Sequence, residues 1–188
     1  DSFSTGSSSS INISFNSTGI LYIGYKDYDL YSTHNVKKFN SVTGLWEMVG
    51  TAIATQDANN FRMILTPDDT PYVFYTDATA SNKGTVRKFN GSAWVTVGNA
   101  GFTPTSIINN SIAVSSTGSV YVAYSSWINS IMSASVMKFD GTSWQLVGNQ
   151  SLSGGGTSNI VLKINPVTDE PYLCYTDFNS SYGATVKK

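Results

Sequence analysis

Apolar and polar residues alternate in short runs along the whole chain, and this alternation predicts β-strands. The clearest runs have an apolar residue at every second position and lie at residues 11–15, 61–65, 112–114 and 160–164. Each is followed by a turn rich in Ser, Thr, Asp and Gly, and then by a second apolar run. No stretch shows a sustained apolar period of 3.6 residues, so we expect almost no helix.

These runs recur with a period close to 50 residues. The second run of each unit has the pattern Tyr-x-x-Tyr, with steps of 50, 49 and 51 between its first tyrosines, Tyr22, Tyr72, Tyr121 and Tyr172. A third run contains a valine two positions before a lysine, at Val36, Val86, Val136 and Val186. A fourth has the pattern Trp-x-x-Val-Gly and begins at Trp46, Trp94 and Trp144. Three motifs that share one period identify a tandem array.

Four short antiparallel strands in each unit of about 50 residues are typical of the blades of a β-propeller. We therefore predict an all-β fold, a single propeller segment over residues 1–188. It has a leader loop at 1–10 and blades at about 11–50, 51–98, 99–148 and 149–188. The last blade has no Trp-x-x-Val-Gly run and so lacks its outer strand. A β-sandwich is the alternative fold, but it gives no reason for a 50-residue period.

The motifs resemble the Trp and Val-Gly propeller repeats of large secreted or surface proteins of bacteria. The segment from Val36 to Val49 also resembles the corresponding part of a kelch blade. The chain departs from kelch because the expected glycine pair is absent, the equivalent positions being Gly24, Phe74, Ala123 and Cys174. The resemblance implies the fold and a secreted or cell-surface location, and it carries over no catalytic residue.

The strand count predicts an open arc. Fifteen of the sixteen strands expected of four blades are found in the sequence, and the leader does not supply the missing one. We expect the ring to be completed by another copy of the chain or by the remainder of a longer polypeptide.

Composition narrows the possible partners. The chain has 188 residues, of which 40% are hydrophobic and 12% charged, with a formal net charge of −1. A nucleic-acid binder would show a basic excess, so that class is not expected. No run of 18 apolar residues is present, so no membrane insertion is expected. A single cysteine excludes an internal disulfide framework.

Long and variable connections are expected at one end of the blades, and loops on rigid scaffolds commonly carry function. Aromatic rings among neutral polar side chains suit a sugar, which stacks through its C–H face and hydrogen-bonds through its hydroxyls. The candidate ligand-binding rings are Tyr28, Tyr31, Trp127, Phe178 and Tyr182. In the alternative, which we favour, these rings pack the loops against the blades.

Three aspartates, Asp27, Asp77 and Asp177, follow the second run of their units at equivalent positions. They are either one ligand or cation contact per blade or residues that close the strand end by accepting backbone N–H bonds, and we favour the second interpretation. His34 has no second histidine or cysteine near it from which a zinc site or a catalytic triad could be built. We therefore expect no metal and no cofactor.

Carboxylates are few, and most are explained by turns, whereas glycoside hydrolysis needs a pair of them. The sequence thus predicts that the chain is not an enzyme but a non-catalytic propeller segment for adhesion, display or assembly. Two alternatives stay open. One is a carbohydrate-binding, lectin-like propeller that uses the long-loop face, and the other is a part of a propeller hydrolase whose catalytic residues lie outside this chain.

Overall fold

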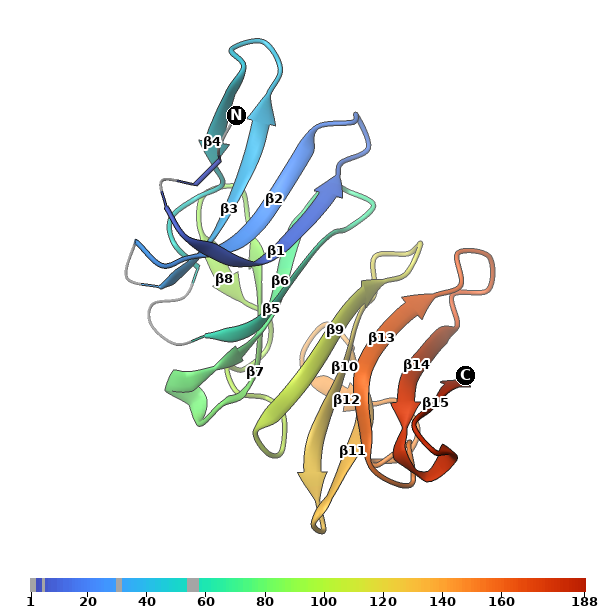
Figure 1. The fold of residues 1–188 in the computed structure, drawn as a ribbon. Coiled ribbons are helices and arrows are strands. Elements are labelled where there is room, and N and C mark those ends of the chain that lie inside the picture. Colours follow the sequence, from blue (N-terminus) through green and yellow to red (C-terminus); the bar gives the residue numbers. More distant parts are fainter. Residues whose placement is uncertain (1–2, 5, 30–31, 54–57) are drawn as a thin grey trace.

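The computed structural model describes residues 3–4, 6–29, 32–53 and 58–188, and it forms four antiparallel sheets (Figure 1). The first blade consists of β1 (Ser8–Phe15), β2 (Leu21–Asp27), β3 (Thr33–Asn40) and β4 (Leu45–Met48). The second consists of β5 (Asn59–Leu65), β6 (Pro71–Asp77), β7 (Lys83–Phe89) and β8 (Trp94–Thr96). The third consists of β9 (Ile107–Val114), β10 (Val120–Ile128), β11 (Ile131–Phe139) and β12 (Trp144–Leu146). The fourth has three strands, β13 (Thr157–Ile164), β14 (Pro171–Asp177) and β15 (Gly183–Lys187).

The predicted all-β fold is confirmed. Each strand pairs with its neighbours in chain order, and the last sheet lacks a fourth strand among the described residues. Helical structure in the described part of the chain is confined to two 3₁₀ turns, η1 (Ala78–Ala80) and η2 (Phe178–Ser180). No helix that the structure describes has the length and apolar character needed to cross a membrane.

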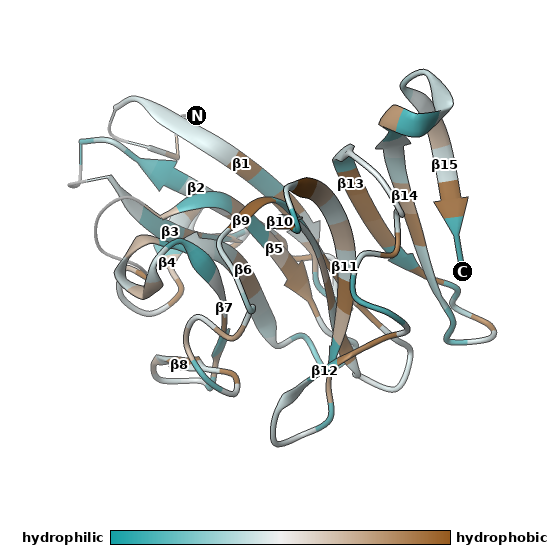
Figure 2. Ribbon diagram, turned by 90° about the horizontal axis from the view of Figure 1, so that it is seen from below, coloured by the Kyte–Doolittle hydropathy of each residue, from teal (hydrophilic) through white to brown (hydrophobic). Residues whose placement is uncertain are grey.

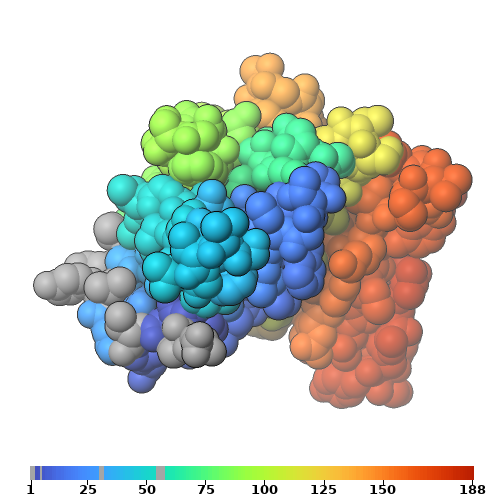
Figure 3. Space-filling model, turned by 90° about the horizontal axis from the view of Figure 1, so that it is seen from above, coloured from blue at the N-terminus to red at the C-terminus, as the bar shows by residue number. Residues whose placement is uncertain are grey.

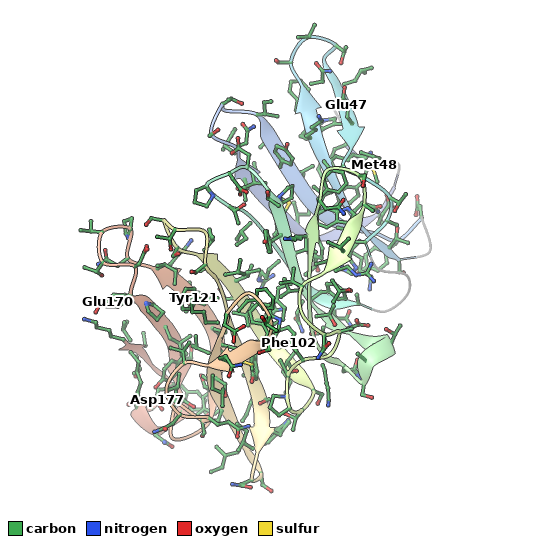
Figure 4. All side chains as sticks on the ribbon, turned by 180° about the vertical axis from the view of Figure 1, so that it is seen from behind. Glu47, Met48, Phe102, Tyr121, Glu170 and Asp177 are labelled. Carbon is green, nitrogen blue, oxygen red and sulfur yellow. The ribbon has the colours of Figure 1, made fainter. Side chains whose placement is uncertain are left out.

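The blades follow one another around an arc, with β1, β5, β9 and β13 innermost and in contact in that order (Figures 1 and 2). The connections β1–β2 and β3–β4, and their equivalents, lie at one end of the blades, here called the turn face (Figure 3). The connections β2–β3 and their equivalents lie at the other end, here called the loop face. Glu170 and Asp177 mark these two ends of β14 (Figure 4).

Facing sheets bury three apolar interfaces. Between the first two blades, Val36 and Phe61 are fully buried, and between the last two, Ala123 and Leu162 are buried. The interface between the second and third blades is centred on Phe74 and its neighbours. Burial of these alternating side chains is the main stabilising contribution that the repeat pattern encodes.

The Trp-x-x-Val-Gly motif joins consecutive blades. The indole N–H of Trp94 donates to the carbonyl oxygen of Val49 in the preceding blade over 2.8 Å, and Trp144 makes the same bond to Val97 over 2.9 Å. The glycine after each valine has a positive φ, which favours glycine, and a Cβ at Gly98 would lie 3.1 Å from the Trp144 ring. The motif therefore marks the position of a tryptophan that inserts between blades.

A second repeated contact fixes the loop that enters the first, second and fourth blades. The side chains of Lys37, Arg87 and Lys187, equivalent residues on β3, β7 and β15, donate to loop carbonyl oxygens over 2.6, 2.5 and 2.7 Å. The accepting residues are Phe3, Ile53 and Leu152. Phe3 thus lies where Ile53 and Leu152 lie in later blades.

The innermost strands contain a feature that simple alternation does not predict. Each has a register shift against its neighbour, and in three of the four strands a residue with positive φ, Ser10, Asn60 or Asn159, lies at the shift. These irregularities are β-bulges, which bend a strand and expose backbone groups. Asn60 uses the bend to donate to the carbonyl oxygen of Ile108 in the next blade over 2.5 Å.

Candidate functional site

A groove of about 730 Å³ opens on the turn face between the first two blades. This volume falls within the range of about 300–1,000 Å³ typical of small-molecule sites. Its wall combines two tyrosines, two lysines, an asparagine and two aspartates, namely Tyr22, Tyr72, Lys38, Lys88, Asn90, Asp68 and Asp69.

The tyrosines and lysines come from cross-strand pairs. Tyr22 on β2 lies opposite Lys38 on β3, and Tyr72 on β6 lies opposite Lys88 on β7. Directly opposed residues share a face of the sheet, so each blade presents one aromatic ring beside one ammonium group. Lys38 also forms a half-exposed ion pair with Glu47 at 3.5 Å.

Asp68 supplies the groove with a carboxylate. The hydroxyl of Thr66 donates to it, and this bond holds the pKa of the Asp68 carboxyl below its ordinary value. Burial raises the pKa of the Tyr72 hydroxyl, and the nearby charge of Asp68 adds to the shift. At neutral pH the groove therefore contains an ionised acceptor beside a neutral phenol donor.

Asp69 is used structurally. Its carboxylate accepts the backbone N–H and the hydroxyl of Ser17 in the first blade, over 2.7 and 2.6 Å. Asp169 makes the same contact to Ser116 between the third and fourth blades, over 2.9 and 3.1 Å. The equivalent residues of the first and third blades are Gly19 and Gly118, all four residues having positive φ. The clamp therefore appears at alternate junctions.

A second hollow, of about 380 Å³, lies where the inner strands converge on the turn face. One equivalent apolar residue from each blade lines it, namely Phe15, Leu65, Val114 and Ile164. Serine and threonine side chains from the adjacent turns complete its rim. Both hollows lie on the turn face, whereas the sequence predicts a ligand site on the loop face.

The aromatic residues predicted as ligand contacts are only partly brought together. The rings of Phe178 and Tyr182 form a pair with centroids 4.9 Å apart, and Tyr182 is 70% exposed. Tyr28 instead hydrogen-bonds Ser9 at 3.0 Å. Trp127 is exposed on β10 in a different blade, and Tyr31 lies outside the described residues. The assignment of these rings to a ligand stays a prediction.

The three predicted aspartates are engaged within the chain. Asp77 accepts the N–H of Thr79 at 3.0 Å and the hydroxyl of Thr85 at 2.8 Å. Asp177 likewise accepts the N–H of Asn179 at 2.9 Å and caps η2, and Asp27 accepts the N–H of Asp29 at 3.1 Å. These contacts are those of residues that close a strand end.

Sequence reasoning missed the groove residues because each of them looks like an ordinary strand or turn residue. The tyrosines and lysines were visible as repeats, yet only the cross-strand register places Tyr72 beside Lys88. The acidic pair Asp68 and Asp69 has the composition of an ordinary turn. Among the described residues, no three His, Cys, Asp or Glu side chains gather closely enough to hold a metal ion.

Comparison with known proteins identifies the fold. No family model and no curated protein sequence matches the chain. A protein of unknown function from Dyadobacter fermentans matches with a TM-score of 0.59 and 10% identity, over 87% of this chain and 47% of its own. A thermostable family-43 glycoside hydrolase matches with a TM-score of 0.55 and 13% identity, over 98% and 72%. An endo-1,4-β-xylanase from Bacteroides thetaiotaomicron matches with a TM-score of 0.55 and 12% identity, over 100% and 78%.

The similar structures are propeller-fold proteins, several of them glycoside hydrolases, so the propeller is confirmed while the repeat type is not. The chain spans about half the length of the Dyadobacter protein. The prediction that the chain is not an enzyme is contradicted, because its structural neighbours include a family-43 hydrolase, a xylanase and a hydrolase of the mannoside phosphorylase family.

Proposed function

We propose that this chain is part of a β-propeller glycoside hydrolase and that its turn-face groove binds a saccharide. The observation that carries the proposal is the fold match, because a family-43 hydrolase and a xylanase superpose on 98% and 100% of the chain. It favours the hydrolase alternative over the adhesive or display role that the sequence analysis placed first. Fold likeness alone does not define a substrate, so the case for a saccharide rests on the residues that line the groove.

The groove chemistry suits a neutral sugar. The rings of Tyr22 and Tyr72 offer apolar surface for sugar C–H groups, and the ionised Asp68 accepts hydroxyl protons. Lys38 and Lys88 donate to sugar oxygens from the same wall. A bound saccharide thus finds donors, acceptors and a stacking surface within one cleft.

Hydrolysis also needs a carboxylic acid that is protonated near neutral pH, and such groups have a raised pKa. Among the described carboxyls, every resolved pKa shift is downward, the groups being Glu47, Asp68, Asp140, Asp169 and Glu170. We therefore propose, in line with the hydrolase alternative, that the proton donor lies outside this chain, whose role is that of scaffold and saccharide subsite.

The two ends of the arc support completion of the ring by further blades. Val186 on β15 is 62% exposed, while its equivalents Val36 and Val86 are fully buried against a following blade. Ile13 on β1 is 65% exposed, while its equivalent Leu162 is 1% exposed against a preceding blade. We propose that another copy or the remainder of a longer polypeptide covers these faces, and that the complete protein is secreted or displayed at the cell surface.

Saccharide binding by the chain tests the proposal. Xylo-oligosaccharides and β-1,2-linked manno-oligosaccharides would be titrated into the purified chain by calorimetry. We expect Asp68→Asn to weaken binding by about tenfold, since a hydrogen bond to a charged group contributes about 1.5–3 kcal/mol. Asp140→Asn, in an exposed turn outside the groove, is the matched control. The absence of binding to every oligosaccharide would contradict the proposal.

The exposed pair Phe178–Tyr182 favours a second candidate, a lectin-type contact on the loop face. The same titration separates the two. Loss of binding in Tyr182→Ala with retention in Asp68→Asn would assign the saccharide to the loop face.

A further inference from the structure

A further hollow, of about 390 Å³, lies on the turn face between the β5–β6 turn and the β9–β10 turn. The first turn contributes Thr66, Pro67 and Asp68 to its wall, and the second contributes Ser116, Thr117 and Gly118. Asp68 and Tyr72 line both this hollow and the groove of about 730 Å³ between the first two blades. Figure 3 shows the turns of the first three blades as neighbours on this face, in blue, blue-green and yellow.

This hollow is open because a contact that closes the junctions on either side of it is missing. At those junctions an aspartate accepts the N–H and the hydroxyl of a serine in the preceding turn, as Asp69 does with Ser17. Between the second and third blades, Gly118 stands in place of the aspartate and Pro67 in place of the serine. Gly118 has no carboxylate, and Pro67 has neither an N–H nor a hydroxyl to donate. Among the described residues, no hydrogen bond joins these two turns.

The lining of the hollow has the character of a neutral sugar site. The ring of Tyr72 packs at the margin of the core between the second and third blades, and Pro67 beside it is exposed. The ionised Asp68 accepts hydroxyl protons, and Ser116, which donates its own hydroxyl to Asp169 over 3.1 Å, keeps lone pairs that accept further hydrogen bonds. The described residues that line the hollow include no lysine or arginine, which disfavours an anionic ligand.

The third blade does not continue the series of available rings. Tyr121, the equivalent of Tyr22 and Tyr72, is only 7% exposed, and the ammonium group of Lys138 lies 5.3 Å from its ring centroid. Tyr22 and Tyr72 are half-buried. Stacking surface on this part of the turn face therefore belongs to the first two blades, and the series ends at the turn of the third.

We propose that the ligand of the turn face is an extended oligosaccharide, which runs from the groove between the first two blades, over Asp68 and Tyr72, into this second hollow. The inference rests on the saccharide-binding function proposed above and adds a second subsite to it. Each hollow alone has a volume within the range of about 300–1,000 Å³ typical of small-molecule sites, so each holds a part of the ligand. Successive units of a saccharide present the same groups, and each hollow offers them a ring and a hydroxyl acceptor.

The dependence of affinity on ligand length tests the inference. Disaccharides and hexasaccharides of the xylo- and β-1,2-linked manno- series would be titrated into the 188-residue chain by calorimetry. We expect a hexasaccharide to bind at least about tenfold more tightly than the disaccharide of its series, because only the longer ligand reaches the second hollow. Equal affinities would overturn the inference and leave the proposed function intact, whereas the absence of all binding would overturn both.

The repeat itself supplies a variant that closes the second hollow. Pro67→Ser combined with Gly118→Asp restores the donor and the acceptor of the missing contact, and aspartate suits this backbone because Asp69 also has a positive φ, of 63° against 83° at Gly118. In the double variant the hexasaccharide should bind within about twofold of the disaccharide, whose own affinity should not change. Gly19→Asp is the matched control, since it adds the same charge at a similar φ of 81° outside both hollows. A length dependence that survives in the double variant would overturn the inference.

Backbone amide NMR of the unmodified chain locates the second subsite without any substitution. Gly91 lies in the groove between the first two blades, and Gly118 lies in the second hollow. A hexasaccharide should shift the amide resonances of both glycines, whereas a disaccharide should shift that of Gly91 alone. A hexasaccharide that leaves the Gly118 resonance in place would overturn the inference.

Discussion

The ring of His34 stacks on the ring of Phe61 with centroids 4.7 Å apart, inside the first interface between blades. The histidine is fully buried, and neither ring nitrogen has a hydrogen-bond partner among the described residues. Burial, aided by the charge of Lys26, lowers its pKa to about 4. A neutral imidazole therefore serves as a packing group in a place where sequence reasoning found only an isolated titratable residue.

This burial predicts a pH-dependent stability. The unfolded chain binds a proton at His34 near pH 6.5, whereas the folded chain does so only near pH 4, so the unfolded state binds more protons between these values and stability falls as pH falls. Between pH 7 and pH 5 the free energy of unfolding should fall by about 2 kcal/mol. Urea unfolding at several pH values measures it.

His34→Phe is the control, because it keeps the stack and removes the only histidine of the chain. The slope of stability against pH between 5 and 7 should disappear in this variant. A slope that persists unchanged would show that another group is responsible.

The bond between Trp144 and Val97 predicts the result of a conservative substitution. Trp144→Phe keeps most of the ring but leaves the Val97 carbonyl oxygen without the indole donor, which should cost about 1–3 kcal/mol in the free energy of unfolding. Trp46→Phe is the comparison, since Trp46 is half-buried at the exposed end of the arc and packs beside Phe3. Equal losses in the two variants would contradict a specific role for insertion between blades.

Alanine substitutions at Gly98 and Gly118 distinguish the cost of backbone strain from the cost of a steric contact. Both have positive φ, of 71° and 83°, so alanine costs about 1–2 kcal/mol at either position. At Gly98 the new Cβ would also meet Trp144 at 3.1 Å, while at Gly118 nothing lies within 4 Å. Gly98→Ala should therefore destabilise the chain more than Gly118→Ala in matched urea titrations. The reverse order would argue against the tight contact.

The strand array could be predicted from the sequence because its information is local. Apolar alternation and turn composition specify where strands begin and end, and the Trp-x-x-Val-Gly motif records a contact that recurs at every complete junction. The bulges at Ser10, Asn60 and Asn159 could not be predicted in this way, because one inserted residue changes register without disturbing the composition of the strand.

The candidate site was less predictable because it lies between blades. The partners of Tyr72 and Asp68 depend on cross-strand register and on which turns of adjacent blades meet, and neither is written in a single repeat. The length and variability of the connections favour the loop face as the binding surface. The two hollows nevertheless lie on the turn face, where the connections are short. The strand-end hydrogen bonds of Asp77 and Asp177 are easier to predict, since they use only neighbours along the chain.

The alternating carboxylate clamp makes a last prediction. Asp169 accepts the backbone N–H and hydroxyl of Ser116, and these bonds lower its pKa, so the contact is present at neutral pH and weakens as pH falls through the folded-state pKa. Asp169→Ala should speed the hydrogen exchange of the Ser116 amide while leaving the amide of Ser17, which Asp69 holds, unaffected. Asp69→Ala should give the opposite pattern. Each clamp joins only its own pair of blades, so we expect the two junctions to open independently. Simultaneous acceleration at both serines in either variant would show instead that the blades open together.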